Sequence, residues 1–344
     1  MIMTNPDNAF SLEIFPWQQN QWQQLNQMIQ QQRLPHALIV GGVPGLGKFT
    51  FVKALAATLL CQQQVNSNAC GQCKSCRLFA ANNHPDYKLL QPAEVGKAIL
   101  VDQVRSIQHA LATTAQQGGA RVVVINGASD LNLNAANALL KQLEEPGDNS
   151  YFLLIHQWPK VVLPTVRSRC QLLDITNPTP SQGLSWLQQK LAADKLSTQD
   201  TEHLLRLANG APLKAIELHT SNAQALRHQM LVELTAILRG KKSPLEVAQI
   251  WYKQPLVPML GWWIEWLNDL IKLKMTGDTH HVSNLDIIKL LQAVAARSDI
   301  LAIYRLLEKL TEQLNFINQR RNLNAQLVCE ELLHQWYFLV RSGN

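Results

Sequence analysis

The segment HALIVGGVPGLGKFT, residues 36–50, places a short apolar run directly before a glycine-rich loop. The run Ala37–Val40 predicts a buried β-strand, and a helix is expected to open at about Phe49. The loop between them has the spacing G-x-x-x-x-G-K of a phosphate-binding loop. In such a loop, backbone N–H groups converge on phosphate oxygens and the lysine reaches the terminal phosphates. The candidate nucleotide-binding residues are Gly42, Gly45, Gly47 and Lys48.

Two parts of an ATP-hydrolysing site are missing around this loop. The position after the lysine should carry a hydroxyl that binds magnesium, and here it is Phe49. Thr50 would point about 100° away on a helix. The strand expected next to the loop is followed by Asn126-Gly127, where a hydrolase needs an acidic ligand. We therefore expect no hydrolysis by this chain alone. Nucleotide binding without turnover stays open, as does a purely structural use of the glycines in a tight turn.

Short apolar runs alternate with helical patterns from His36 to about Ile175. Continuous apolar runs are typical of parallel strands buried on both faces, so an α/β layered domain is expected. The Gln-rich opening, Trp17–Arg33, is expected to be a helix with a solvated Gln face. The five predicted strands are Ala37–Val40, Tyr87–Leu90, Arg121–Ile125, Phe152–Ile155 and Cys170–Ile175.

After Ile175 the pattern becomes all helical. Three short helical patterns follow the linker-like stretch Asn177–Pro180, and longer amphipathic stretches begin at Ser221. Five of the nine tryptophans lie in these longer stretches. A helix-bundle core is the favoured interpretation, and packing against another subunit is the alternative. The short helical patterns are Ser185–Leu191, Thr201–Ala208 and Leu213–Leu218, and the five tryptophans are Trp251, Trp262, Trp263, Trp266 and Trp336.

Four of the six cysteines form the pattern C-x8-C-x2-C-x2-C. The x2 spacing lets neighbouring thiolates converge on one ion, and four thiolates suit a closed, structural Zn²⁺ site. Buried or reactive free cysteines are the alternative. His84 could replace one ligand, although His84-Pro85-Asp86 is better explained as a turn into the next strand. Cys170 and Cys329 are expected to be small core residues. The candidate zinc ligands are Cys61, Cys70, Cys73 and Cys76.

Length, charge and hydropathy limit the remaining possibilities. A chain of 344 residues with 47% hydrophobic and 16% charged residues is typical of a folded protein with two or three domains. The net charge of +6 is compatible with nucleic acid or an acidic partner without requiring either. Met1–Leu12 shows no secretory pattern, and the apolar region Pro255–Ile271 carries Glu265, Asn268 and Asp269. We expect a cytoplasmic protein with no membrane segment.

The order of the motifs resembles a known family. Four motifs in this order carry the resemblance: a degenerate phosphate loop, a four-cysteine module after its helix, NALLKQLEEP at 137–146, and Ser168-Arg169-Cys170. The chain resembles the clamp-loader subunits of bacterial DNA polymerase III, which are AAA+ proteins. The motifs cover about Pro16 to Ile175. The resemblance implies an α/β plus all-α protein: an AAA+ P-loop parallel-sheet domain with an inserted zinc module, a three-helix lid, and a helical collar that supplies most assembly contacts. The expected boundaries are 1–175, with the zinc module at 61–76, then 176–219 and 220–344.

Within this family the residues favour the stator branch over the gamma/tau motor branch. Motors resemble full ATPases, whereas this chain has Phe49, Asn126 and Gly127 at the positions of the hydroxyl and the paired acids. The arginine that motors carry in the small helical domain aligns with Leu213. The resemblance therefore implies a clamp-loader subunit with a degenerate ATP site and no catalysis of its own. An active gamma/tau-like clamp-loader ATPase is the alternative.

The resemblance also assigns a role in trans to Arg169. In the family this arginine is a finger that projects into the ATP site of the adjacent motor subunit, where a planar cation suits the transferred phosphoryl group. From the residues alone, the slightly favoured interpretation is an ordinary loop arginine or one that pairs with a local carboxylate. The implied partners are gamma/tau motor subunits and the delta subunit in a hetero-pentamer that loads the sliding clamp onto primed DNA. Exposed Lys141, Glu144 and Glu145 leave an intersubunit role open.

A zinc-dependent DNA-binding module is another class of function. It would use the four-cysteine segment for recognition. That segment carries only Lys74 as a basic residue before Arg77, which is little charge for neutralising phosphates. The sequence therefore favours a structural role for the cysteines.

Overall fold

The structure, a computed structural model, describes residues 12–94, 96–111, 115–117, 119–194, 196–221, 223–318 and 323–341. The opening residues on which the expectation about a secretory signal rests lie, except for Leu12, outside the described part. The chain divides into two compact units, Met1–Leu196 with Gly210–Ala215 and Ser197–Asn209 with Ile216–Asn344. The division runs through the stretch expected to form a lid, so the three-domain organisation remains a prediction.

The first unit contains a five-stranded parallel sheet in the order β2-β3-β4-β1-β5. In register, Ala37 lies opposite Phe152 and Leu38 opposite Gln171, which places β1 between β4 and β5. This is the α/β parallel-sheet arrangement expected from the sequence. All five predicted strands are confirmed within two residues at each end. The strands are β1 (Ala37–Gly41), β2 (Tyr87–Leu90), β3 (Arg121–Asn126), β4 (Ser150–Ile155) and β5 (Gln171–Asp174).

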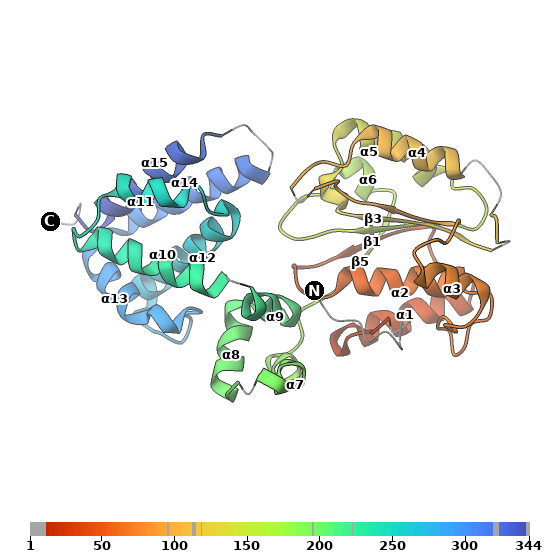
Figure 1. Cartoon of the computed structure of the whole chain (residues 1–344), viewed down its shortest axis with the longest axis horizontal. Helices are drawn as coiled ribbons and strands as arrows, with labels where there is room; N and C mark the ends of the chain where they lie inside the picture. The colour runs from red at the N-terminus through yellow and green to blue at the C-terminus, as the bar shows by residue number, and fades with distance from the viewer. Residues whose placement is uncertain are drawn as a thin grey trace. The chain divides into compact units, whose positions relative to one another are not determined.

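Helices cover both faces of the sheet (Figure 1). On one face, Leu139 and Leu143 share a buried cluster with Ala37 and Ile39. On the other face, the Gln-rich helix, which was expected from the sequence, buries Trp22 and Leu25. Trp22 packs edge-on against Phe51 with ring centroids 5.5 Å apart. The first face carries α4 (Val101–Leu111), α5 (Leu133–Glu144) and α6 (Pro164–Arg167), and the second carries α1 (Gln19–Gln30), α2 (Lys48–Leu60) and α3 (Lys74–Ala80).

The prediction that every strand is buried on both faces is wrong for the two edge strands. Leu89 of β2 is 37% exposed and Leu172 of β5 is 42% exposed. An edge strand has a neighbour on one side only, so the covering helices shield it less completely than the centre of the sheet. The inner strands β1, β3 and β4 are nearly continuous in burial, as their sequences predict.

Beyond the sheet, the described elements are all helical, as expected. Trp263 packs edge-on against both Trp251 and Trp336, at centroid distances of 5.5 and 5.8 Å. The core interpretation is confirmed for these residues and for Trp266, while Trp262 is half-buried against the same cluster. The helices are α7 (Pro180–Lys190), α8 (Thr198–Leu207), α9 (Pro212–Thr220), α10 (Ala223–Leu238), α11 (Pro244–Trp251), α12 (Leu256–Thr276), α13 (Ile288–Arg297), α14 (Ile300–Asn318) and α15 (Ala325–Leu339).

Among the described residues, none of these helices combines the length and the apolar character needed to cross a bilayer. The 21-residue helix α12 instead buries a charge. Asp269, only 1% exposed, accepts hydrogen bonds from the backbone N–H groups of Ser283 and Asn284, from Asn284 Nδ2 at 2.8 Å, and from Lys272 at 3.1 Å. The carboxylate therefore anchors the loop after α12 to the helix bundle.

Replacing Asp269 by alanine should destabilise this bundle by about 3 kcal/mol, because buried N–H donors lose their acceptor. Chemical denaturation followed by circular dichroism measures the change. Asn268→Ala, at the exposed neighbouring position, is the matched control and should shift the free energy of unfolding by less than about 0.5 kcal/mol. Equal effects of the two substitutions would contradict the anchoring role.

Candidate functional site

The glycine-rich loop joins β1, at the centre of the sheet, to α2. Gly42, Gly45 and Gly47 have φ values of 140°, 84° and 76°. These are conformations that side chains with a Cβ rarely adopt, so the turn itself requires glycine at these positions. Gly47 is also the N-cap of α2, and Lys48 is the first residue of the helix. The sequence placed this loop and its flanking elements correctly.

The loop is packed against other parts of its own chain. Trp17 Nε1 and Gln18 Nε2 donate to the Leu46 carbonyl oxygen at 3.0 and 2.7 Å, and the N–H of Leu213 donates to the Gly45 carbonyl at 3.1 Å. A Cβ added at Gly47 would collide with the ring of Phe15. Sequence reasoning missed these partners. Their only local signal is the aromatic pair directly before the Gln-rich helix.

Lys48 folds back onto the loop rather than pointing outward. Its side chain is 4% exposed, and Nζ donates to the carbonyl oxygens of Gly42 at 2.7 Å and Val43 at 2.5 Å. Burial lowers the pKa of Lys48 to about 8. The ammonium group is thus held by backbone oxygens of the same loop, and phosphate would have to compete with those contacts.

The carboxyl ends of the neighbouring strands carry no acidic pair at the expected place. Asn126 ends β3 and Gly127 follows it with φ 108°. Asp130 lies further on, and its carboxylate accepts from Lys160 Nζ at 2.8 Å. After β4, His156 Nδ1 lies 2.9 Å from the hydroxyl of Ser129. Burial, together with the positive charges of Lys48 and Arg167, lowers the pKa of His156 and favours its neutral form.

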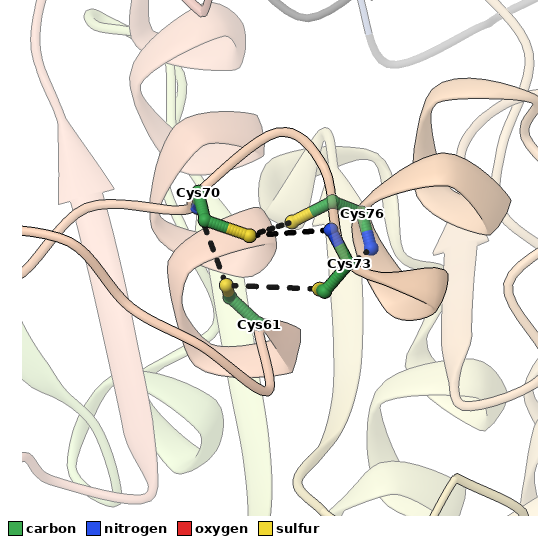
Figure 2. A group of neighbouring side chains, drawn as sticks. All are labelled: Cys61, Cys70, Cys73 and Cys76. Carbon is green, nitrogen blue, oxygen red and sulfur yellow. Dashed lines mark hydrogen bonds between the residues drawn. The ribbon is translucent and has the colours of Figure 1, made fainter.

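The four candidate cysteines converge on one point at the other end of α2. Their sulfur atoms face one another (Figure 2), and all lie within 4.8 Å of each other. The pairs Cys61–Cys73 and Cys70–Cys76 are both separated by 3.9 Å between Sγ atoms. Four thiolates around a tetrahedral metal with bonds of about 2.3 Å would be about 3.8 Å apart. The cluster therefore has the geometry of a four-cysteine metal site.

Backbone N–H groups point at these sulfur atoms. The N–H of Cys70 donates to Cys61 Sγ and the N–H of Cys73 donates to Cys70 Sγ, both at 3.3 Å, and the N–H of Cys76 donates to Cys73 Sγ at 3.4 Å. Burial opposes ionisation of Cys73, but the N–H of Cys76 and further hydrogen bonds outweigh it and lower the pKa of that thiol to about 6. These donors favour the thiolate form of Cys73, whereas burial raises the pKa of Cys61 and Cys76.

His84 lies outside the cluster. It is buried, its Nε2 is 2.7 Å from the Ser75 hydroxyl, and its Nδ1 accepts from the N–H of Asp86. Ser75 in turn donates to the Leu60 carbonyl at 2.5 Å. His84 therefore joins the ends of α2 and α3 to the chain entering β2. This matches the turn expected for His84-Pro85-Asp86.

Arg169 follows α6 and pairs with Glu144, the last residue of α5. Its Nε donates to Glu144 Oε1 at 2.6 Å, and Nη2 contacts the same oxygen. Nη1 donates to the Thr165 carbonyl at 2.8 Å. The fold thus brings together two of the motifs recognised in the sequence, NALLKQLEEP and Ser168-Arg169-Cys170. Neither residue contacts the cysteine cluster or the glycine-rich loop through any described hydrogen bond or ion pair.

Comparisons with known proteins agree with this arrangement of motifs. Residues 17–179 match a family model described as DNA polymerase III, delta subunit, and residues 221–337 match one for the C-terminal part of that subunit. The chain is 36% identical to DNA polymerase III subunit delta' of Pseudomonas aeruginosa, covering 96% of this chain and 99% of that protein. It is 32% identical to the protein of that name in Escherichia coli K12, covering 93% and 94%.

Among solved structures, a DNA polymerase III gamma subunit-related protein of Thermotoga maritima aligns with a TM-score of 0.40 at 16% identity, covering 93% of this chain and all of that one. A RuvB structure from the same organism aligns with a TM-score of 0.38 at 15% identity, covering 62% and 60%.

Gly47→Ala should destabilise the first unit by about 3 kcal/mol or more, because the added Cβ meets the Phe15 ring as well as adopting a positive φ. Gly96→Ala is the control, since Gly96 has a similar φ of 84° but no atom within 4 Å of the added Cβ. We expect a cost of about 1 kcal/mol there. Denaturant unfolding measures both. Similar losses would show that packing against the loop contributes nothing.

Proposed function

This chain belongs to the DNA polymerase III delta-prime subunit family, and we propose that it is the stator of a clamp loader: it does not turn over ATP itself and completes the ATP site of a neighbouring motor subunit. The observation that carries the proposal is the contrast between two sites. At its own loop, Lys48 is bound to backbone oxygens and the hydroxyl and acidic positions are Phe49 and Asn126. At the second site, just after α6, the Arg169 side chain is a partly exposed cation.

The chain's own loop supports a structural role. Its glycines are needed for the turn, and Phe15, Trp17 and Gln18 pack on it. A functional ATPase needs magnesium held by a hydroxyl and an acid near the phosphates, and a group that positions water. Asp130, the nearest acid after β3, is paired with Lys160. An active gamma/tau-like ATPase is therefore the less favoured function, and nucleotide bound without turnover would have to displace the Lys48 contacts.

Arg169 is the group that this chain would contribute to catalysis elsewhere. A guanidinium carries a permanent charge and offers paired N–H donors to phosphoryl oxygens, which stabilises the charge that develops during transfer. Its side chain is 32% exposed, so it is accessible without unfolding of the surrounding residues. The alternative of a purely local ion pair with Glu144 is compatible with the same contacts, and the experiment below distinguishes the two.

Assembly with the gamma/tau motors and the delta subunit would use the helical second unit. An open groove lies between α10 and α13, with an apolar floor that includes Leu231, Val232 and Leu290. Lys289 and Arg297 belong to its basic rim. Such a surface suits a neighbouring subunit that presents an apolar helix face bordered by acidic residues. In the complete hetero-pentamer the chain would act on the sliding clamp and primed DNA in the cytoplasm.

The cysteine cluster would hold Zn²⁺ in a structural role. All four ligands come from protein, which leaves no open position for catalysis. A bound ion would tie the C-terminal end of α2, at Cys61, to the N-terminal turn of α3, where Cys73 is the N-cap and Cys76 lies in the first turn. The cluster would thereby stabilise the segment 61–76, which contains few apolar residues that could form a core of its own.

Replacing Arg169 by alanine should leave assembly intact and slow ATP hydrolysis at the adjacent site by about a thousandfold, the effect typical of an arginine finger. The assay is clamp- and DNA-stimulated ATPase of the reconstituted complex, built with motor subunits whose own trans arginines are alanine, so that the site next to Arg169 is measured alone. Arg167→Ala, an exposed arginine two residues away, is the matched control. Unchanged hydrolysis with Arg169→Ala would remove the proposed role.

Elemental analysis of the reduced, folded protein should find about one equivalent of zinc per chain. Cys73→Ser should lose the metal and lower the melting temperature, because the free energy of metal binding, which stabilises the folded state, would be lost. Cys170→Ser should retain full zinc, since Cys170 is not part of the cluster. A folded protein without stoichiometric zinc would refute the assignment.

A further inference from the structure

We propose that Glu144 is a positioning residue that holds the Arg169 guanidinium in one orientation for its contact with the neighbouring subunit. This inference rests on the proposed function of Arg169 and adds a second residue to it. The supporting contact is an ion pair in which Nε and Nη2, on one side of the Arg169 guanidinium, both contact Glu144 Oε1. Restricting a long, flexible side chain before it meets its target reduces the entropy lost on contact.

The pattern of donors shows which part of the guanidinium stays available. An arginine has five N–H groups. Glu144 accepts at the edge of the guanidinium formed by Nε and Nη2, and Nη1 donates to the Thr165 carbonyl oxygen at 2.8 Å. Ser168 Oγ, which lies 3.2 Å from that carbonyl, is a second acceptor for Nη1, at 3.3 Å. Among the described residues, Nη2 has no acceptor other than Glu144 Oε1, so the N–H of Nη2 on the end-on side is available.

The end-on pair, one N–H on each Nη atom, is the fork that can bind two phosphoryl oxygens at once. A carboxylate that blocked the finger would be expected on this end, because it would then compete directly with phosphate. Glu144 instead contacts the edge formed by Nε and Nη2, so its carboxylate does not occupy the end of the guanidinium. The geometry therefore favours orientation of Arg169 over masking of its charge.

Glu144 is itself well anchored. It ends α5 directly after Leu143, which is buried in the core on that face of the sheet. The other end of α5 is capped by Asn132, whose side chain accepts from the N–H of Ala135 at 2.7 Å. A carboxylate at the last turn of a rigid, core-packed helix is a better fixed point than one on a loop.

The pair contributes little to folding stability. Arg169 is 32% exposed and Glu144 50% exposed, and ion pairs at such positions are screened by solvent. Loss of the carboxylate should therefore change neither the fold nor the melting temperature. An effect of Glu144 on catalysis would then report orientation of Arg169 and not general damage.

The test is the same single-site ATPase assay with variants of residue 144. Glu144→Ala should lower kcat at the Arg169-dependent site about tenfold with KM for ATP unchanged, because nucleotide is bound by the motor subunit. Glu144→Gln keeps an acceptor oxygen without the charge and should fall between alanine and the parent. Glu145→Gln, the adjacent exposed carboxylate with no described contact to Arg169, should retain the parental rate.

The double variant Glu144→Ala, Arg169→Ala should be no slower than Arg169→Ala alone, since Glu144 acts only through the arginine. A normal or raised kcat with Glu144→Ala, while Arg169→Ala is slow, would overturn the positioning role and leave the proposed function intact. A normal rate with Arg169→Ala would overturn the proposed function itself. An additive double variant would also refute the inference, because it would show that Glu144 acts independently of Arg169.

Discussion

A glycine-rich turn between a central strand and a buried helix has to satisfy its polar groups, and in this protein the chain itself does so. Lys48 donates to two carbonyl oxygens of the turn, while Trp17 and Gln18 donate to a third. Leaving such groups buried and unpaired would cost about 1–3 kcal/mol each. These contacts within the chain hold β1 against α2 at the turn. Helix α2, which begins at this turn, ends at Cys61 and so also positions one ligand of the cysteine cluster.

Much of the first unit could be predicted from the sequence because its inner strands are continuously apolar and its breakers are glycines. Those signals are local, and they placed all five strands, the phosphate-type loop and the four cysteines. The contacts that define the two polar sites were not predictable in the same way. Gln18 reaches Leu46 across 28 positions, and Arg169 reaches Glu144 across 25. Pairing between distant polar side chains follows no periodicity, so only the fold reveals it.

The edge strands show a related limit. Leu89 and Leu172 belong to apolar runs like those of the inner strands, yet both are partly exposed. The composition of a run indicates that it pairs in a sheet, but its position in the sheet depends on the crossovers between strands. In the helical part, by contrast, four of the five tryptophans lie in the core as expected, and Trp262 packs half-buried against it. Large aromatic side chains bury so much surface that few other environments suit them.

The placement of the tryptophans gives the protein a built-in optical signal. Trp251, Trp263, Trp266 and Trp336 are all 3% exposed or less, so their fluorescence emission will be blue-shifted while the second unit is folded and will move to longer wavelength when water enters. Trp158 differs, because it is 40% exposed in the segment after β4. Its emission will respond to molecules that bind at that end of the sheet. Tryptophan fluorescence can therefore follow both unfolding of the second unit and binding near Trp158.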